Sequence, residues 1–426
     1  MAQINPFRSL LYNQEKVDLK KVIMPPYDII KEKDAGIYYR RDPHNIIRVD
    51  KGSAEENDGD RNNRYTRAAD LLDEWMMDGV LLPDGEESFY AHTQEYRLPG
   101  GEKKEMTGFF AAVKLEEFDR KIVLPHERTH SGPKKDRLDL MRATHANTSP
   151  ILSLYFDKTK KIHAILKKTM RAKPFIDVAG YDSLRSRMWR ITSKGDIKKI
   201  KVFFGSKQLF IADGHHRYET AINFRNEMRQ KLGIEETPYD NIMMCLISME
   251  HSGISILPTH RVFADFRGFD PLSPAVGEFF KVKKVPSAGA MKKAMLKRTA
   301  GKKIGLVLPK GFFILELRLK PYLAVLPKKE HIRQYYLLSV SILHTLLFER
   351  ILGIKEQEIL HGIGYTQDID EALKLGKKSK RSAAFLLEPS TVEEVKEMSL
   401  HGEVMPQKST YFLPKLSTGF LINKMG

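Results

Sequence analysis

One short junction constrains the fold of this chain more than any other stretch of its sequence. Residues 209–212 are apolar and favour a strand, Asp213 and Gly214 interrupt them, and a helical pattern continues to about Arg229. A helix that starts directly after a strand presents free N–H groups and a partial positive charge, which bind anions. Glycine at the bend lets the backbone approach a ligand. The junction therefore predicts an anion site at the carboxyl end of a strand, where open α/β sheets place their sites.

Side chains that suit phosphate chemistry crowd this junction. Asp213 supplies a carboxylate, His215 and His216 exchange protons near neutral pH, and Arg217 binds anions through two parallel hydrogen bonds. A solvated helix cap is the alternative interpretation. The density of ionisable groups on one turn favours a functional site.

The motif at this junction resembles known phosphate-binding turns. Residues 214–217, Gly-His-His-Arg, resemble the turn of the ParB/sulfiredoxin-like superfold, and with Asp213 they are similar to that of archaeal free serine kinases. The resemblance implies a mixed α/β (α+β) fold, in which a ParB/sulfiredoxin-like core carries inserted and appended α+β modules. It also implies phosphoryl transfer to free L-serine. The whole chain further resembles a broad prokaryotic family of unknown function, through stretches that include 25–28, 147–151, 257–261 and 405–415.

A second stretch, residues 125–133, carries a His-Glu-x-x-His pattern between positions 126 and 130. Such a pattern on a helix is typical of zinc hydrolases. Here Pro125 precedes it and Ser-Gly-Pro follows it, and these residues end a helix within about one turn, so we reject the zinc interpretation. Pro125-His126-Glu127 before a helix starting near Lys134 instead resembles the free serine kinases, whose catalytic glutamate lies there.

The two site stretches are far apart in this sequence. In the superfold they lie close together, whereas 86 positions separate Glu127 from Asp213 here. The resemblance therefore requires an inserted subdomain between them.

Phosphoryl transfer needs a base or positioner for the acceptor, a metal on the donor phosphates, and cations on the transferred oxygens. We expect Glu127 to act as the base, Asp213 to hold Mg²⁺, and His215 to assist catalysis. The expected phosphate-binding residues are Gly214, His216, Arg217, Lys408, Ser409 and Thr410. The candidates for binding the substrate are Asp136 with Arg137 or His260 with Arg261, between which the sequence does not decide, and in addition Asn147 and Ser149.

The chain length of 426 residues predicts more than one domain. We expect an N-terminal α+β region at 1–120, a catalytic core with an insertion at 121–265, an α+β module at 266–330, and a C-terminal region at 331–426 that packs back on the core. Hydrophobic patterns predict helices at 64–77, 162–171 and 335–352, hairpins at 89–113 and 304–317, strands at 151–156 and 241–247, and a strand pair at 201–212.

Composition limits the possible partners. The 71 basic and 54 acidic residues give a net charge of +17, which suits anionic ligands, although the lysines are spread along the chain as on a solvated surface. Cys245 is the only cysteine and lies in an apolar run, so we expect it to be buried, with neither an internal disulfide nor a thiolate metal cluster. No signal peptide or apolar run of about 18 residues is evident, which predicts a cytoplasmic protein.

The leading hypothesis is a small-molecule kinase that phosphorylates free L-serine. ATP, ADP and pyrophosphate all remain candidate donors, because no P-loop or dinucleotide fingerprint occurs. The alternatives are a ParB-like nucleotide-sensing or nucleic-acid-binding regulatory protein, and a phosphate-ester hydrolase. We expect neither a membrane nor nucleic acid as a partner, and a homodimer is left open.

Overall fold

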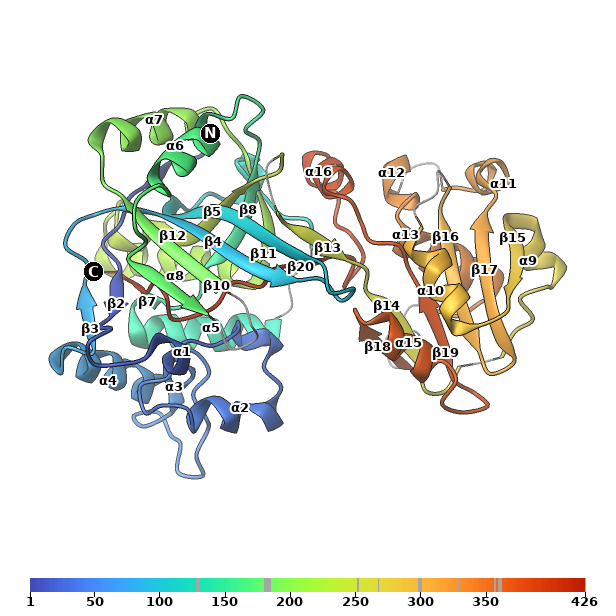
Figure 1. The fold of residues 1–426 in the computed structure, drawn as a ribbon, viewed down its shortest axis with the longest axis horizontal. Helices are drawn as coiled ribbons and strands as arrows, with labels where there is room; N and C mark the ends of the chain where they lie inside the picture. The colour runs from blue at the N-terminus through green and yellow to red at the C-terminus, as the bar shows by residue number, and fades with distance from the viewer. Residues whose placement is uncertain are drawn as a thin grey trace. The chain divides into compact units, whose positions relative to one another are not determined.

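A computed structural model describes the chain at residues 1–127, 131–179, 185–250, 253–266, 268–297, 301–327, 330–355, 358 and 362–425. Two compact units are present (Figure 1). The first comprises Met1–Ile254 together with Pro414–Gly426, and the second comprises Ser255–Leu413. The last stretch of the chain thus returns to the first unit.

The first unit is built on one mixed sheet, which has nine strands in the described part of the chain. In order across the sheet they are β6 (Val123–Leu124), β11 (Leu209–Asp213), β8 (Ile151–Tyr155), β12 (Asn241–Ser248), β5 (Lys103–Lys114), β4 (Phe89–Arg97), β10 (Arg185–Ile191) and β9 (Ile176–Ala179), with β1 (Ile4–Asn5) also on β5. The pair β11–β6 is parallel, β11–β8 is antiparallel and β8–β12 is parallel.

Apolar residues explain why β12 lies in the middle of this sheet. Residues 242–247 form a continuous apolar run and all are buried, as expected for a strand covered on both faces. Cys245 belongs to this run, and burial raises the pKa of its thiol. Gly108 on β5 has a packing role, since a Cβ there would lie 2.8 Å from the Leu246 carbonyl oxygen. The buried thiol matches the expectation from sequence.

Helices cover the sheet of the first unit. In Figure 1 the blue helices α1 to α4 lie on its lower side together with α5, and α6 and α7 lie above it. α5 contacts both α4 and α8, and α3 contacts α4. The elements are α1 (Leu19–Val22), η1 (Tyr27–Ile29), α2 (Glu32–Tyr39), α3 (Ile47–Asp50), α4 (Arg64–Met77), η2 (Phe118–Arg120), α5 (Ser131–Thr144), α6 (Lys161–Thr169), α7 (Lys194–Phe204), α8 (His215–Leu232) and η3 (Pro238–Asp240).

Two small ribbons tie distant parts of the chain to this unit. β2 (Leu10–Tyr12) pairs with β3 (Leu81–Pro83), and β7 (Ala146–Asn147) pairs with β21 (Asn423–Lys424). The second ribbon anchors the returning C-terminal segment beside the end of α5.

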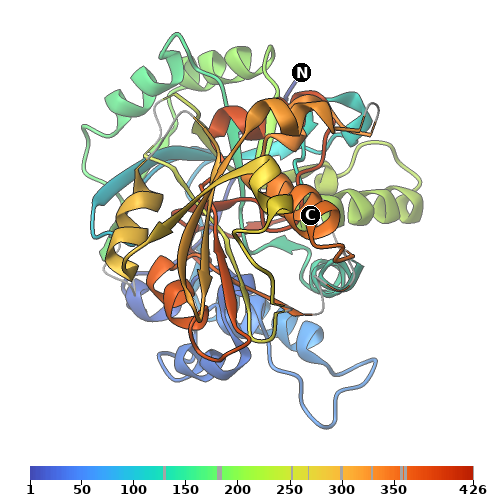
Figure 2. The same ribbon diagram turned by 90° about the vertical axis from the view of Figure 1, so that its right-hand side faces the viewer.

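The second unit is a six-stranded sheet in the described residues, flanked by helices (Figure 2). Its strands in order are β15 (Phe280–Val285), β17 (Gly311–Leu317), β16 (Lys303–Leu308), β19 (Ala383–Leu386), β14 (His260–Phe263) and β18 (Ile363–Thr366), and β13 (Ser255–Leu257) pairs with β20 (Tyr411–Leu413). Its helices are α9 (Pro274–Phe279), α10 (Ala288–Leu296), α11 (Leu319–Ala324), α12 (Arg333–Tyr336), α13 (Ser339–Ser341), the π-helix η4 (Ile342–Ile351), α15 (Ile369–Leu375) and α16 (Val392–Leu400).

The mixed α/β (α+β) class predicted from the sequence is confirmed, as are both hairpins and the helix at 64–77. Of the strand pair predicted at 201–212, the second strand is present as β11, but the first is wrong because 194–204 form α7. Ser193 caps this helix by accepting a hydrogen bond from the Asp196 backbone N–H, and Ile200 and Phe204 are buried at helical spacing. The helix expected at 335–352 is broken into α12, α13 and a π-helical stretch.

The compact units have other bounds than the four regions expected from sequence. Residues 266–330 and 331–413 share one sheet, since β16 pairs with β19. The segment between Glu127 and Asp213 adds β8, β9 and β10 to the main sheet.

No helix within the described ranges combines the length and apolar character needed to cross a lipid bilayer.

Candidate functional site

The junction after β11 has the predicted form of strand, bend and helix. β11 ends at Asp213, Gly214 has a φ of 97°, and α8 begins at His215. That φ lies in the left-handed region, which side chains other than glycine rarely adopt. A Cβ on Gly214 would also lie 3.0 Å from Nε of Arg217. Both the backbone conformation and the close approach therefore require glycine here.

Asp213 is ion-paired through both of its carboxylate oxygens. Oδ2 lies 2.9 Å from Nη2 of Arg217, and Oδ1 lies 2.6 Å from Nζ of Lys415. Burial acts to raise the pKa of Asp213, but Lys415 and Arg217 outweigh burial and hold the pKa well below its usual range. The carboxylate is therefore ionised at any physiological pH.

Arg217 is buried and ties the junction to the strand beside it. Its Nη1 donates a hydrogen bond to the carbonyl of Pro150, the residue just before β8. Lys415 comes from the returning C-terminal segment, which makes it a long-range partner of the motif. Asp213 is thus paired with one cation from the next turn of the chain and with another from near its end.

Two histidines lie edge to face beside the junction. The backbone N–H of His126 donates to Nε2 of His215 at 3.3 Å, and Nδ1 of His126 lies 2.9 Å from the carbonyl oxygen of Ile211. The ring centroids are 4.6 Å apart at 85°. Because Nε2 of His215 accepts a hydrogen bond, its proton is assigned to Nδ1. Burial, reinforced by His126, lowers the pKa of His215 well below its ordinary value, and burial also lowers the pKa of His126.

The sheet brings the Pro-His-Glu stretch to the junction after β11. β6 and β11 are parallel, with Leu209 opposite Val123 and Phe210 opposite Leu124, so both strands end at the same edge. Residues 125–127 follow β6 directly, as 213–217 follow β11. Residues 128–130, including the second histidine of the His-Glu-x-x-His pattern, lie outside the described residues. His126 precedes α5, which begins at Ser131.

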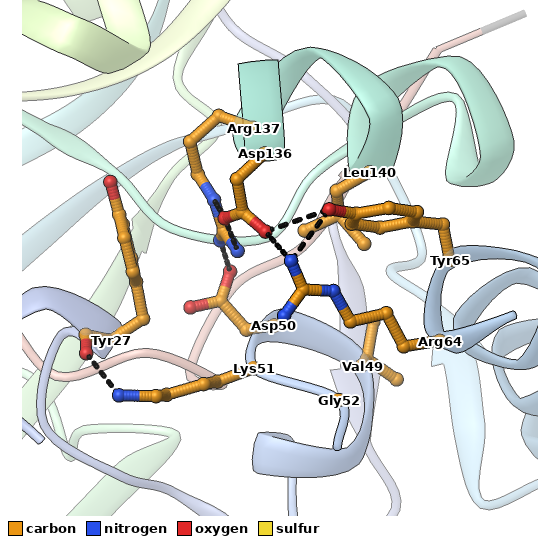
Figure 3. Close-up of a pocket in the computed structure, with 10 residues that line it drawn as sticks. All are labelled: Tyr27, Val49, Asp50, Lys51, Gly52, Arg64, Tyr65, Asp136, Arg137 and Leu140. Atoms are coloured by element: carbon orange, nitrogen blue, oxygen red, sulfur yellow. Dashed lines mark hydrogen bonds and ion pairs between the residues drawn. The ribbon is translucent and has the colours of Figure 1, made fainter. Parts of the chain in front are cut away.

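Asp136 and Arg137 on α5 belong to a compact charge network (Figure 3). Asp136 accepts hydrogen bonds from Arg64 at 2.7 Å and Tyr65 at 3.0 Å through Oδ1, and from Arg137 through Oδ2. Arg137 also reaches Asp50 at 3.3 Å. These residues border a cavity of about 210 Å³.

Asp50 connects this network to the residues before β8. Thr148 donates to its Oδ1 at 2.6 Å and Ser149 to its Oδ2 at 2.9 Å. A cavity of about 30 Å³ is bordered by Asp50, Arg137, Ser149 and Arg217 together. Arg137 and Ser149 thus border the same cavity as Arg217, and Asp136 is joined to them through Arg137.

Asn147 also borders the small cavity, but its amide oxygen is already engaged. It accepts hydrogen bonds from the backbone N–H of Met243 at 3.2 Å and from Nδ2 of Asn423 at 2.9 Å. Asn147 therefore joins β12 to the C-terminal segment.

His260, Arg261 and residues 408–410 belong to the second unit. Nδ1 of His260 accepts the backbone N–H of Leu387 at 3.1 Å, and Arg261 donates to the carbonyls of Thr259 and Gln407. Burial lowers the pKa of His260 to about 4 and that of Arg261 to about 10. Ser409 donates to the carbonyl of Pro406. These contacts are all internal to that unit and do not tie the residues to the junction.

Sequence reasoning missed four residues of this site: Lys415, Asp50, Arg64 and Tyr27. Lys415 and Tyr27 lie in stretches that resemble the family of unknown function, 405–415 and 25–28, so that resemblance was a usable signal. Asp50 and Arg64 lie in no motif and are recognised only by their contacts.

The site fits Mg²⁺ only as a single-carboxylate site. Asp213 has the carboxylate oxygens that Mg²⁺ prefers, and an ion there would share them with Arg217 and Lys415. Among the described residues no group of three or more histidine, cysteine or acidic side chains is arranged to hold a metal ion. Phosphate oxygens and water would therefore have to complete the coordination.

Comparison with known proteins gives one family match and several distant likenesses. The model of DUF1015, a protein family of unknown function, matches residues 4–340. No curated protein matches.

Among solved structures, a free serine kinase in complex with AMP is 15% identical with a TM-score of 0.32, covering 72% of this chain and 88% of that chain. A mutant of a free serine kinase in complex with ADP is 15% identical with a TM-score of 0.35 and the same coverage. A conserved hypothetical protein from Pyrococcus furiosus is 15% identical with a TM-score of 0.32, covering 72% of this chain and 90% of that chain. These likenesses are too distant to assign an activity.

Proposed function

We propose that this chain, which belongs to the DUF1015 family of proteins of unknown function, is a kinase that converts free L-serine to O-phospho-L-serine. The observation that carries the proposal is the contact between the backbone of His126 and the ring of His215. This contact joins the Pro-His-Glu stretch to the Asp-Gly-His-His-Arg turn, although the two histidines are 89 positions apart in the sequence. The serine acceptor itself rests on the resemblance of these two stretches to the free serine kinases.

The turn has the charge distribution that a phosphoryl donor requires. The N-terminus of α8, an 18-residue helix, lies beside Arg217 and Lys415. Backbone N–H groups and cations that are fixed before the reaction stabilise the charge on the transferred phosphoryl group. In this proposal Arg217 and Lys415 contact the donor phosphates, and His215 and His216 orient their oxygens.

Glu127 is the proposed base. It follows the strand β6, whose end lies at the same sheet edge as Asp213. As the serine oxygen forms its bond to phosphorus and the donor oxygen–phosphorus bond breaks, Glu127 takes the hydroxyl proton and the donor leaves as the shortened phosphate. Asp213 would hold Mg²⁺ with the donor phosphates, and the ion would neutralise their charge.

The test is an assay of the purified full-length protein with L-serine, Mg²⁺ and, in turn, ATP, ADP or pyrophosphate. We expect phosphorus NMR and mass spectrometry to show O-phospho-L-serine with at least one donor. Glu127→Gln should lower the rate by roughly a hundredfold or more, because general base catalysis contributes on this scale, while donor binding persists. Absence of phosphoserine with every donor would overturn the proposal, and phosphate release without serine would favour a hydrolase.

A further inference from the structure

The cavity bordered by α3, α4, α5 and η1 has no assigned role. Its walls carry Lys51, Arg64 and Arg137 against Asp50 and Asp136, so the lining has one excess positive charge. Its volume is about 210 Å³, which leaves room for a ligand of the size of a small amino acid.

Most of the charged groups around this cavity already have partners. Arg137 uses Nε and Nη2 for Asp136 and Nη1 for Asp50, and its guanidinium stacks on the ring of Tyr27 at 3.9 Å. Lys51 donates to the backbone carbonyls of Tyr27 and Ile30. The sequence-predicted substrate residues Asp136 and Arg137 are therefore occupied in building the wall.

Arg64 is a cation of this cavity whose guanidinium still has N–H donors for a ligand. Its Nη2 binds Asp136 and the hydroxyl of Tyr65, and within the described residues Nε and Nη1 have no hydrogen-bond partner. The Tyr27 hydroxyl also lacks one there, and because burial raises the pKa of Tyr27 to about 12 it remains a donor. Figure 3 shows Arg64 reaching from α4 to Asp136 on α5. The remaining polar groups are donors, which suit a carboxylate.

The backbone around Arg64 is well fixed. Asn63 caps α4 by accepting hydrogen bonds from Tyr65 and Thr66, and the Thr66 side chain completes a capping box. A Cβ on Gly52 would lie 3.2 Å from the carbonyl oxygen of Arg64, so glycine keeps the end of α3 close to the start of α4. The cap thus fixes the backbone of Arg64, and Asp136 and Tyr65 position its guanidinium.

We propose that this cavity binds the carboxylate of the acceptor amino acid, with Arg64 as its main ligand. The inference rests on the proposed function, because it places the acceptor next to the phosphate turn. The adjoining small cavity shares Asp50 and Arg137 with this one and is also bordered by Arg217. Asp50 and Arg137 therefore border both cavities, and the smaller cavity leads from them to Arg217.

The first test compares steady-state kinetics of the full-length protein and its variants. Arg64→Ala should raise the KM for L-serine roughly ten- to a hundredfold, as expected for loss of a charged hydrogen-bonding group, with the donor KM within about twofold. Arg64→Lys, which keeps the charge but loses the planar fork of donors, should raise the serine KM roughly two- to tenfold and serves if Arg64→Ala does not fold. The matched control is Arg67→Ala on the same helix, because Arg67 pairs with Asp58 at 2.6 Å and is not part of the cavity.

The second test measures binding without any donor, by calorimetry with L-serine, ethanolamine and inorganic phosphate. We expect L-serine to bind, Arg64→Ala to abolish its heat, and ethanolamine, which lacks the carboxylate, to give none. Equal binding of serine and ethanolamine, or displacement of serine by phosphate at equal concentration, would overturn the proposal. If both variants form phosphoserine with an unchanged KM for serine, the proposed carboxylate site is wrong and the proposed kinase activity stands. If serine binds in a way that requires Arg64 but no phosphoserine forms with any donor, the carboxylate site is supported and the proposed kinase activity is wrong.

Discussion

Asp213 has both carboxylate oxygens in ion pairs, one with Arg217 in the next turn and one with Lys415 from the end of the chain. The Arg217 pair spans four positions and follows from the local helix. The Lys415 pair joins residues 202 positions apart. The charge of the site therefore depends on a residue that the motif does not contain.

Substituting Lys415 with Met should weaken both the fold and the site. Asp213 would lose one of two cations, so its pKa should rise, and the free energy of unfolding should fall by about 1–3 kcal/mol. Urea unfolding at pH 7 measures this change. Lys424→Met is the matched control from the same segment, because its pair with Asp73 is more exposed and should contribute less than about 1 kcal/mol. Equal effects of the two variants would contradict the role given to Lys415.

His215 should make stability depend on pH in a predictable direction. Burial lowers the pKa of the folded ring below the unfolded value of about 6.5. Between the two values the unfolded chain binds a proton that the folded chain does not, so stability is complete above about pH 6.5 and falls as the pH decreases. The contribution of one such group approaches about 1.4 kcal/mol per pH unit. Urea unfolding at pH 7, 6 and 5 should show a shallower decline for His215→Gln than for the native chain, and identical slopes would contradict this account.

At the scale of elements, the bend between β11 and α8 is the part that local sequence determines most directly. Apolar residues end at Asp213, the hydrophobic period changes, and Gly214 adopts the left-handed conformation that the turn needs. The 201–204 stretch shows the opposite case. A short apolar run is compatible with either a strand or a buried helix. Here Ser193 caps the preceding residues as the start of a helix, and the run continues that helix.

Gly214→Ala and Gly233→Ala separate two costs at the two ends of α8. Both glycines have positive φ, at 97° and 68°, but a Cβ on Gly233 would meet no atom within 4 Å. Gly233→Ala should therefore lower stability by about 1–2 kcal/mol from backbone strain alone and keep the activity. Gly214→Ala should cost this amount or more, displace Arg217 and weaken donor binding. Thermal unfolding and the donor KM measure these effects, and similar donor KM values would argue against a phosphate role for this turn.

At the scale of the whole molecule, the C-terminal segment returns to the first unit and closes its site. Thr418 bridges to Met24, Ile422 to Leu10, and Asn423 pairs with Asn147. Thr418 also contacts Ser149, which itself binds Asp50. Residues 414–426 thus contact the junction, the cavity network and the N-terminal strands.

A chain ending at Leu413 should lose phosphoryl transfer and unfold at lower urea concentration than the full chain. It would lack Lys415 and the partner strand of β7. The assay is turnover and urea unfolding of the truncated chain, with a synthetic peptide of residues 414–426 added to restore both. A truncated chain with native turnover would show that the segment does not take part in the site.

The sequence by itself determined the mixed α/β class, the hairpins and the strand-to-helix bend, because each depends on neighbouring residues: apolar periodicity, turn residues and a glycine where the backbone requires one. It also indicated Glu127 and the phosphate turn as partners, through resemblance. Only the tertiary structure brought these stretches together, through the parallel pairing of β6 with β11, and only it showed Lys415 on Asp213 and Arg64 beside the cavity. Such contacts join residues far apart in the chain, so no local pattern records them, and they are decided by how the sheet and the returning C-terminus pack.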